Sequence, residues 1–122
     1  MMREEDSIQK TIVQGLRVCL PHGWIVVHVP NGMASSRLQG AIFKGLGMLP
    51  GFPDLLVLGC TDEPRPAAWL IEVKALKGSI KPEQRELHDR LQDLGFPVAI
   101  VRSWEDVVDL AREWNWPWRA RA

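Results

Sequence analysis

Two acids and a lysine lie at the ends of two neighbouring apolar segments of this 122-residue sequence. Asp54 opens the segment 55–58, and Glu72 and Lys74 lie near the end of the segment 69–74. The polar turn between the segments is short enough to pair them as antiparallel strands. Side chains alternate across a strand, so Glu72 and Lys74 point to one face. The pairing therefore predicts that Asp54 lies beside Glu72 and Lys74 at one edge of a sheet.

These residue types suit a hard divalent cation and phosphodiester chemistry. Carboxylate oxygens favour Mg²⁺ or Mn²⁺ over zinc, and such an ion lowers the pKa of bound water and polarises a phosphoryl oxygen. A lysine beside the ion can orient the attacking water and stabilise the developing negative charge. An acid at a strand end is often only solvated, but Glu72 lies inside an apolar segment. There it must be paired or bind a metal, which favours the functional interpretation.

Composition and charge narrow the class of protein. The hydrophobic fraction of 46% and the charged fraction of 25% are those of a globular domain. Fifteen basic and fifteen acidic side chains cancel, which argues against a tight passive DNA binder. Cys19 and Cys60 lie in apolar surroundings and are predicted to be buried thiols in a reducing compartment. The sequence shows no signal peptide and no transmembrane segment, so we expect a cytoplasmic protein.

The remaining sequence predicts the elements that position these residues. Glycines and prolines make residues 30–53 the loosest part, which we interpret as a long functional or disordered loop. The first predicted elements are a helix over 4–20, a buried strand over 24–29, and strands over 54–58 and 69–74. A helix over 82–94 follows and is closed by Gly95. An apolar strand over 98–101, covered on both faces, and a last helix capped by Ser103 with Asp106 complete the order. The order αβββαβα predicts an α/β fold with the sheet between helices.

Three segments in this order resemble the VRR-NUC domains of the PD-(D/E)XK nuclease superfamily. The segments are Gly51-Phe52-Pro53-Asp54-Leu55-Leu56, Ile71-Glu72-Val73-Lys74 and Lys81-Pro82-Glu83-Gln84, and the likeness runs from about residue 5 to Leu110. The resemblance implies a restriction-endonuclease-like core with a mixed four-stranded sheet flanked by helices. We expect one such domain over residues 1–122, with residues 119–122 as a frayed tail.

The resemblance also implies an activity and a set of site residues. The activity would be that of a metal-dependent deoxyribonuclease using Mg²⁺ or Mn²⁺. Asp54 and Glu72 would be metal ligands together with the backbone carbonyl of Val73, and Lys74 would be the catalytic lysine. Members of this size resemble homodimeric endonucleases of branched DNA, with Holliday junctions as a substrate. The alternative function is a catalytically silent DNA-binding or scaffolding module of the same fold.

Gln84 and Lys81 begin the third segment and leave alternatives open. Gln84 is either an ordinary glutamine at a helix start or, as the resemblance implies, an active-site residue that bonds to water or phosphate. Many relatives carry serine at the position of Lys81. Lysine caps a helix poorly and its charge opposes the helix dipole. A bound phosphate at this helix end would reconcile Lys81 with its position.

The first helix of the superfamily often contributes a further acid, and Glu5 is our candidate. The competing interpretation is a capping box of Asp6 and Gln9, which leaves Glu5 outside the helix. Glu4 is a further alternative.

Basic and aromatic side chains are candidate DNA contacts. They are Arg37 and Lys44 in the glycine-rich segment, and Lys77 and Lys81 after the site. Asn31-Gly32 follows the first predicted strand in the segment expected to handle the substrate. His28 could face the site from this strand, but a lone histidine in a strand is more often structural. For the tryptophan-rich tail over 114–121, packing on the core or a dimer contact is favoured over base stacking.

Overall fold

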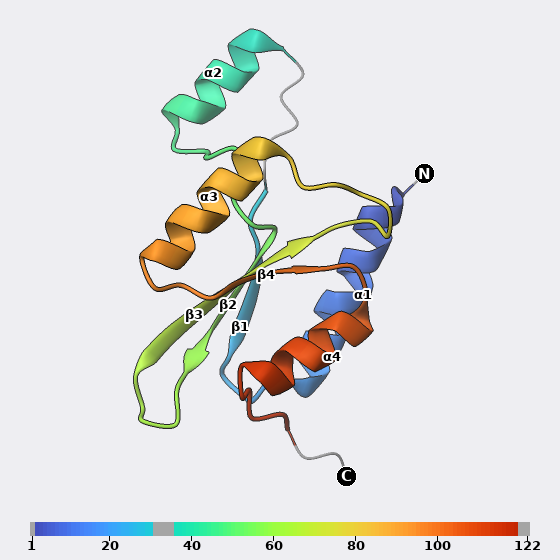
Figure 1. Cartoon of the computed structure of the whole chain (residues 1–122), viewed down its shortest axis with the longest axis vertical. Coiled ribbons are helices and arrows are strands. Elements are labelled where there is room, and N and C mark those ends of the chain that lie inside the picture. Colours follow the sequence, from blue (N-terminus) through green and yellow to red (C-terminus); the bar gives the residue numbers. More distant parts are fainter. Residues whose placement is uncertain (1, 31–35, 120–122) are drawn as a thin grey trace.

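A computed structural model of the chain describes residues 2–30 and 36–119 (Figure 1). The elements, in chain order, are α1 (Glu4–Cys19), β1 (Ile25–His28), α2 (Arg37–Gly45), β2 (Leu55–Cys60), β3 (Pro66–Val73), α3 (Pro82–Asp93), β4 (Val98–Val101) and α4 (Trp104–Glu113). The predicted order of helices and strands is confirmed, and α2 is added to it. None of the helices described has the length and apolar character needed to cross a membrane.

The four strands form one mixed sheet in the order β1-β2-β3-β4. β2 pairs antiparallel with β1 and with β3, whereas β4 runs parallel to β3. In Figure 1, α1 and α4 lie on one side of the sheet and α3 lies on the other. This is the predicted α/β arrangement. The register pairs Leu55 with Ile71, so the beginning of β2 lies beside the end of β3, as the alternation of apolar and charged residues predicted.

The two faces of the sheet bury two separate apolar clusters. Leu55, Val57, Ile71 and Val73 alternate along β2 and β3 and join the larger cluster, to which α1 and α4 contribute Ile12, Leu16, Val107 and Leu110. On the opposite face, Leu70 packs with Leu87 and Leu91 of α3. Because side chains alternate across a strand, Glu72 falls on the α3 side. α3 therefore covers the acid of β3.

The tryptophan-rich tail packs on the core, which is the arrangement that its sequence favours. Trp116 is 5% exposed and belongs to the larger cluster, with Trp114 and Trp118 against it. The backbone N–H of Arg119 donates a 2.8 Å hydrogen bond to the carbonyl oxygen of Cys19. Residues 120–122 of the predicted frayed tail lie outside the described residues.

Both outer strands are less buried than the sequence predicted. β1 was expected to be buried and β4 to be covered on both faces. Each lies at an edge of the sheet, and Ile25 of β1 and Ile100 of β4 are 52% and 41% exposed. Continuous apolar sequence therefore did not mean burial on both faces here.

Three further expectations are corrected. Cys60 is exposed, because it is the last residue of β2 next to the polar turn. β3 begins three residues earlier than predicted, at Pro66. The segment predicted as a loop contains α2, whose N-cap Ser36 accepts a hydrogen bond from the backbone N–H of Gln39. None of the residues of α2 is buried, so packing alone did not dictate this helix.

Candidate metal centre

Three carboxylates from three elements meet at one point. Glu5 of α1, Asp54 just before β2 and Glu72 of β3 each place one carboxylate oxygen within 4.8 Å of the others. Glu72 is buried and the other two are half-buried. A cluster of this kind is an oxygen-donor set of the type that Mg²⁺ and Mn²⁺ prefer. The residues present therefore fit a divalent cation of this class.

Glu5 is the acid that α1 contributes to the cluster. The helix begins at Glu4 with Arg3 as its N-cap, so the alternative capping box of Asp6 and Gln9 is wrong. Glu5 thus lies in the first helical turn, where its carboxylate reaches the other two acids. The carboxylate of Glu4 is used elsewhere, because its Oε2 accepts a 2.9 Å hydrogen bond from the backbone N–H of Leu76.

Asp54 is fixed from both of its neighbouring strands. Its Oδ2 accepts a 2.8 Å hydrogen bond from the backbone N–H of Val73. Its own carbonyl oxygen accepts a 2.8 Å hydrogen bond from the backbone N–H of Val29, just beyond β1. Nδ1 of His28 also lies 3.1 Å from this carbonyl oxygen. His28 thus contacts the backbone of Asp54, which fits the structural interpretation of a lone histidine.

The turn before Asp54 passes close to the beginning of α3. Gly51 has φ = +87°, and a Cβ atom there would lie 2.8 Å from the carbonyl oxygen of Glu83. Only glycine combines that backbone conformation with so close an approach. Gly51 therefore ties the position of Asp54 to the helix that covers Glu72.

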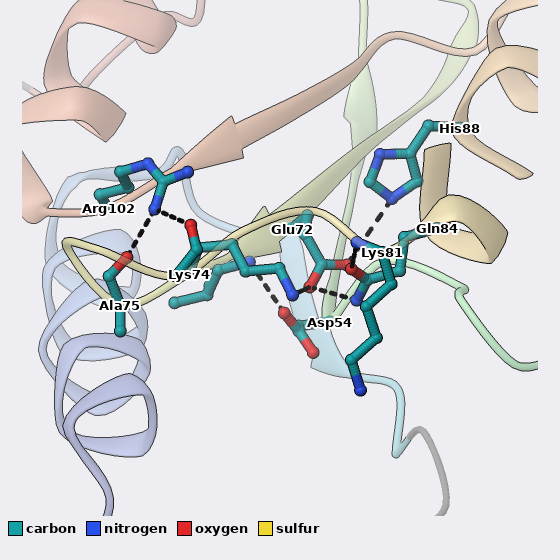
Figure 2. A network of polar contacts seen from close by, with 10 residues as sticks. Asp54, Glu72, Lys74, Ala75, Lys81, Gln84, His88 and Arg102 are labelled. Carbon is teal, nitrogen blue, oxygen red and sulfur yellow. Dashed lines mark hydrogen bonds and ion pairs between the residues drawn. The ribbon is translucent and has the colours of Figure 1, made fainter. Parts of the chain in front are cut away.

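Glu72 is the most deeply buried charged residue of the cluster, with 1% of its surface exposed. Three side chains surround its carboxylate in Figure 2: Gln84 at 3.3 Å, His88 at 3.6 Å and Lys74 at 4.0 Å. Burial raises the pKa of Glu72 to about 9, and hydrogen bonding to Asp54 and its charge add to this effect. The charge of Lys74 acts in the opposite direction. The raised pKa means that metal-free Glu72 retains its proton at neutral pH. A bound divalent cation would replace this proton and stabilise the ionised carboxylate.

Gln84 connects the carboxylate to the beginning of α3. Its Nε2 donates to Oε2 of Glu72, and its Oε1 accepts a 2.9 Å hydrogen bond from the backbone N–H of Lys81. The second bond supplies a cap that the Lys81 side chain does not provide. Both polar atoms of the amide thus bond to protein groups. The expected bond from Gln84 to water or phosphate remains a prediction.

Lys74 follows β3 directly and is 6% exposed. Its backbone N–H donates a 2.9 Å hydrogen bond to the carbonyl oxygen of Val101, which extends the β3–β4 pairing. The loop that follows is held by Arg102, whose Nη1 donates to the carbonyl oxygens of Ala75 and Gly78, each at 2.6 Å. Figure 2 shows the contact between Arg102 and Ala75. Sequence reasoning missed Arg102. Its signal is an arginine directly after the apolar segment 98–101.

The remaining sequence candidates lie around this centre or outside it. Lys77 and Lys81 are exposed on the loop between β3 and α3 and at the beginning of α3. Arg37 and Lys44 are exposed on α2, which Figure 1 shows apart from the sheet, beyond the beginning of α3. Asn31-Gly32 lies outside the described residues. Within residues 2–30 and 36–119, no hydrogen bond ties the backbone carbonyl of Val73 to the cluster, so its role as a ligand remains a prediction.

Comparisons with known proteins agree with this arrangement. The VRR-NUC domain family matches residues 4–105. A solved structure titled "VRR_NUC domain protein" shares the fold with a TM-score of 0.69 and 19% sequence identity, over 93% of this chain and 88% of that chain. A search of curated proteins finds no match. Because the family match covers most of the sequence, the chain belongs to the VRR-NUC domain family, a family of nucleases.

Proposed function

We propose that this VRR-NUC domain is a divalent-metal-dependent DNA endonuclease that hydrolyses phosphodiester bonds in branched DNA. The observation that carries the proposal is the convergence of Glu5, Asp54 and Glu72 within 4.8 Å, with the amine of Lys74 4.0 Å from Glu72. Phosphodiester hydrolysis needs charge neutralisation and a hydroxide near neutral pH. Carboxylates and a buried lysine are the groups that meet these two needs.

Glu5, Asp54, Glu72 and the backbone carbonyl of Val73 would hold Mg²⁺ or Mn²⁺. When bound, the ion lowers the pKa of its water and polarises the phosphoryl oxygen. Asp54 is pre-oriented for this task by the N–H of Val73, and Gln84 holds Oε2 of Glu72. Lys74 orients the attacking water and stabilises the negative charge that develops on the phosphate.

DNA contacts are proposed for the basic side chains around the site. Lys77 and Lys81 would bind phosphates beside the acids, and Arg37 and Lys44 would do so from α2. Lys81 is exposed at the beginning of α3, where a helix N-terminus favours anions. Lys81→Ser should weaken DNA binding and reduce its salt dependence, since one phosphate contact is lost. Unchanged affinity and salt dependence would rule out this contact.

A homodimer is part of the proposal, because two sites are a simple way to cut both strands of a junction. α2 and its C-cap Leu46 offer a surface for the contact: Leu38, Ile42 and Leu46 are 72%, 52% and 80% exposed at four-residue spacing. Sedimentation of the free protein should give a dimer, and Ile42→Glu should give a monomer. Val18→Glu is the matched control, because Val18 is a 63% exposed apolar residue on α1.

The proposal is tested with labelled duplex, single-stranded, flap and four-way-junction DNA incubated with Mg²⁺ or Mn²⁺. We expect cleavage that requires the metal and is fastest on a branched substrate. Equal rates on all forms would retain the nuclease and remove its selectivity. If pure protein binds DNA but cleaves no form, the alternative of a catalytically silent module is correct.

A further inference from the structure

His88 is a buried histidine that the proposed reaction does not yet use. It lies on α3 one turn after Gln84, and 6% of its surface is exposed. Its Nε2 lies 3.6 Å from Oε1 of Glu72. Figure 2 shows the imidazole approaching the carboxylate from the α3 side, next to Gln84. Among the described residues, neither His88 Nε2 nor Glu72 Oε1 has a hydrogen-bond partner.

The two unpartnered atoms are suited to each other. Buried polar atoms in folded proteins are almost always hydrogen-bonded. The distance of 3.6 Å between Nε2 and Oε1 is only slightly longer than a hydrogen bond, and a small rotation of either side chain closes the gap. A neutral imidazole with its hydrogen on Nε2 then donates to Oε1. No change of protonation is needed for this bond.

A bond from His88 would complete the hold of α3 on Glu72. Gln84 already donates to Oε2 at 3.3 Å, so each carboxylate oxygen would accept one hydrogen bond from α3. A carboxylate oxygen has two lone pairs, and one on each oxygen stays available for a metal. With both oxygens held, the carboxylate cannot rotate away from Asp54 and Glu5.

We infer that His88 is a positioning residue, which holds Glu72 through Oε1 in the orientation that ligates the divalent cation. The inference rests on the proposed function for the role of the cation, but the bond itself is a property of the metal-free protein. Side chains that orient metal-binding carboxylates typically change metal affinity or activity by 10- to 100-fold. We expect the loss of His88 to change metal affinity by a factor within this range, although His88 does not touch substrate.

The bond is tested first in metal-free protein by ¹⁵N NMR of the histidine side chains. We expect His88 to carry its hydrogen on Nε2 and its ring signals to shift in Glu72→Gln. A hydrogen on Nδ1 would overturn the inference whatever the protein does to DNA.

Its consequence is tested by titrating each variant with Mn²⁺ in the absence of DNA and following the electron paramagnetic resonance signal of the free ion. His88→Leu should bind Mn²⁺ about 10- to 100-fold more weakly than the wild type. His88→Gln should stay within about threefold, because the amide keeps a donor. Gln92→Leu is the matched control, since it removes a donor one turn further along α3, where Gln92 bonds to the carbonyl oxygen of Val98.

The outcomes separate this inference from the proposed function. Equal Mn²⁺ affinity in folded His88→Leu and wild type would overturn the role of His88 and leave the nuclease intact. The wild type could bind no Mn²⁺ while His88 carries its hydrogen on Nε2 and its ring signals shift in Glu72→Gln. That result would overturn the proposed metal site and retain the hydrogen bond. If His88→Leu does not fold, the NMR result and the Mn²⁺ affinity of His88→Gln decide the matter. A loss of Mn²⁺ affinity in His88→Gln as large as the about 10- to 100-fold loss expected for His88→Leu would refute a role based on hydrogen-bond donation.

Discussion

The backbone N–H of Val73 donates a 2.8 Å hydrogen bond to Oδ2 of Asp54. Asp54 precedes β2 and Val73 ends β3, so this bond joins the two strands at the edge where the carboxylates meet. Oδ1 of Asp54 takes no part in this hydrogen bond. The orientation of Asp54 therefore follows from the pairing of β2 with β3, which also brings Asp54 close to Glu72.

Asp54→Asn should separate structure from metal binding. An asparagine oxygen can still accept the bond from Val73, so the melting temperature should stay close to that of the wild type. The negative charge is lost, and the affinity for Mn²⁺, measured by calorimetry, should fall at least about tenfold. Asp62→Asn is the control, because it removes an exposed acid in the turn between β2 and β3. An unchanged affinity in Asp54→Asn would exclude Asp54 as a ligand.

Glu72→Gln should change the pH dependence of stability. The folded pKa of Glu72 is raised from 4.5 to about 9, so between these values the native state binds a proton that the unfolded state has lost. In metal-free protein, the contribution of Glu72 to the free energy of unfolding is therefore fully present below pH 4.5. It falls as pH rises toward 9, by at most about 1.4 kcal/mol per pH unit. Glutamine does not titrate and should remove this slope.

The measurement is urea unfolding of both proteins from pH 5 to 9, with a chelator present. The difference between the two free energies of unfolding should grow in favour of Glu72→Gln as pH rises. A constant difference would show that Glu72 is not held protonated by its burial.

Arg102→Met should loosen the loop that follows Lys74. The change removes the bonds from Nη1 to the carbonyl oxygens of Ala75 and Gly78, at a cost of about 1–3 kcal/mol in the free energy of unfolding. Cleavage by the folded fraction should also slow, because Lys74 loses its support. Arg112→Met, an exposed position on α4, should stay within about 0.5 kcal/mol of the wild type in the same unfolding experiment. Equal effects of the two variants would contradict the role given to Arg102.

Gly51→Ala should destabilise the protein by more than about 1 kcal/mol, because the alanine must adopt positive φ and meets the backbone of Glu83. Gly45→Ala is the control, since Gly45 is helical and a Cβ there meets nothing within 4 Å. That variant should be neutral or more stable by up to about 1 kcal/mol. Thermal melts of both variants test the contrast. Similar melting temperatures would show that the turn before Asp54 can move away from α3.

Local sequence patterns predicted most of the fold and the centre of the site. Alternation along two strands was enough to bring Asp54 to Glu72, because register follows from which face is apolar. Ser103 began α4 and Gly95 followed the end of α3 where expected, since both residues act through neighbouring backbone groups. α2 was not predicted because Gly40 and Gly45 favour a loop, which outweighs the Ser36 cap and the helical spacing of Leu38 and Ile42.

The unpredicted features depend on which elements pack together. The bond from Gln84 of α3 to Glu72 joins residues 12 positions apart, and Arg102 reaches back 24 to 27 positions to the loop after β3. Exposure of β1 and β4 likewise follows from their place at the sheet edges, which no segment encodes by itself.

Asp54, Glu72 and Lys74 are proposed to form one metal-dependent hydrolytic site. Single-turnover cleavage of the best DNA substrate is measured with Mn²⁺ and with a chelator, in the wild type, Asp54→Asn and Lys74→Met. We predict cleavage by the wild type only with metal, and a rate at least about 100-fold lower in both variants. Cleavage by the wild type in chelator, or variants as fast as the wild type, would contradict the claim.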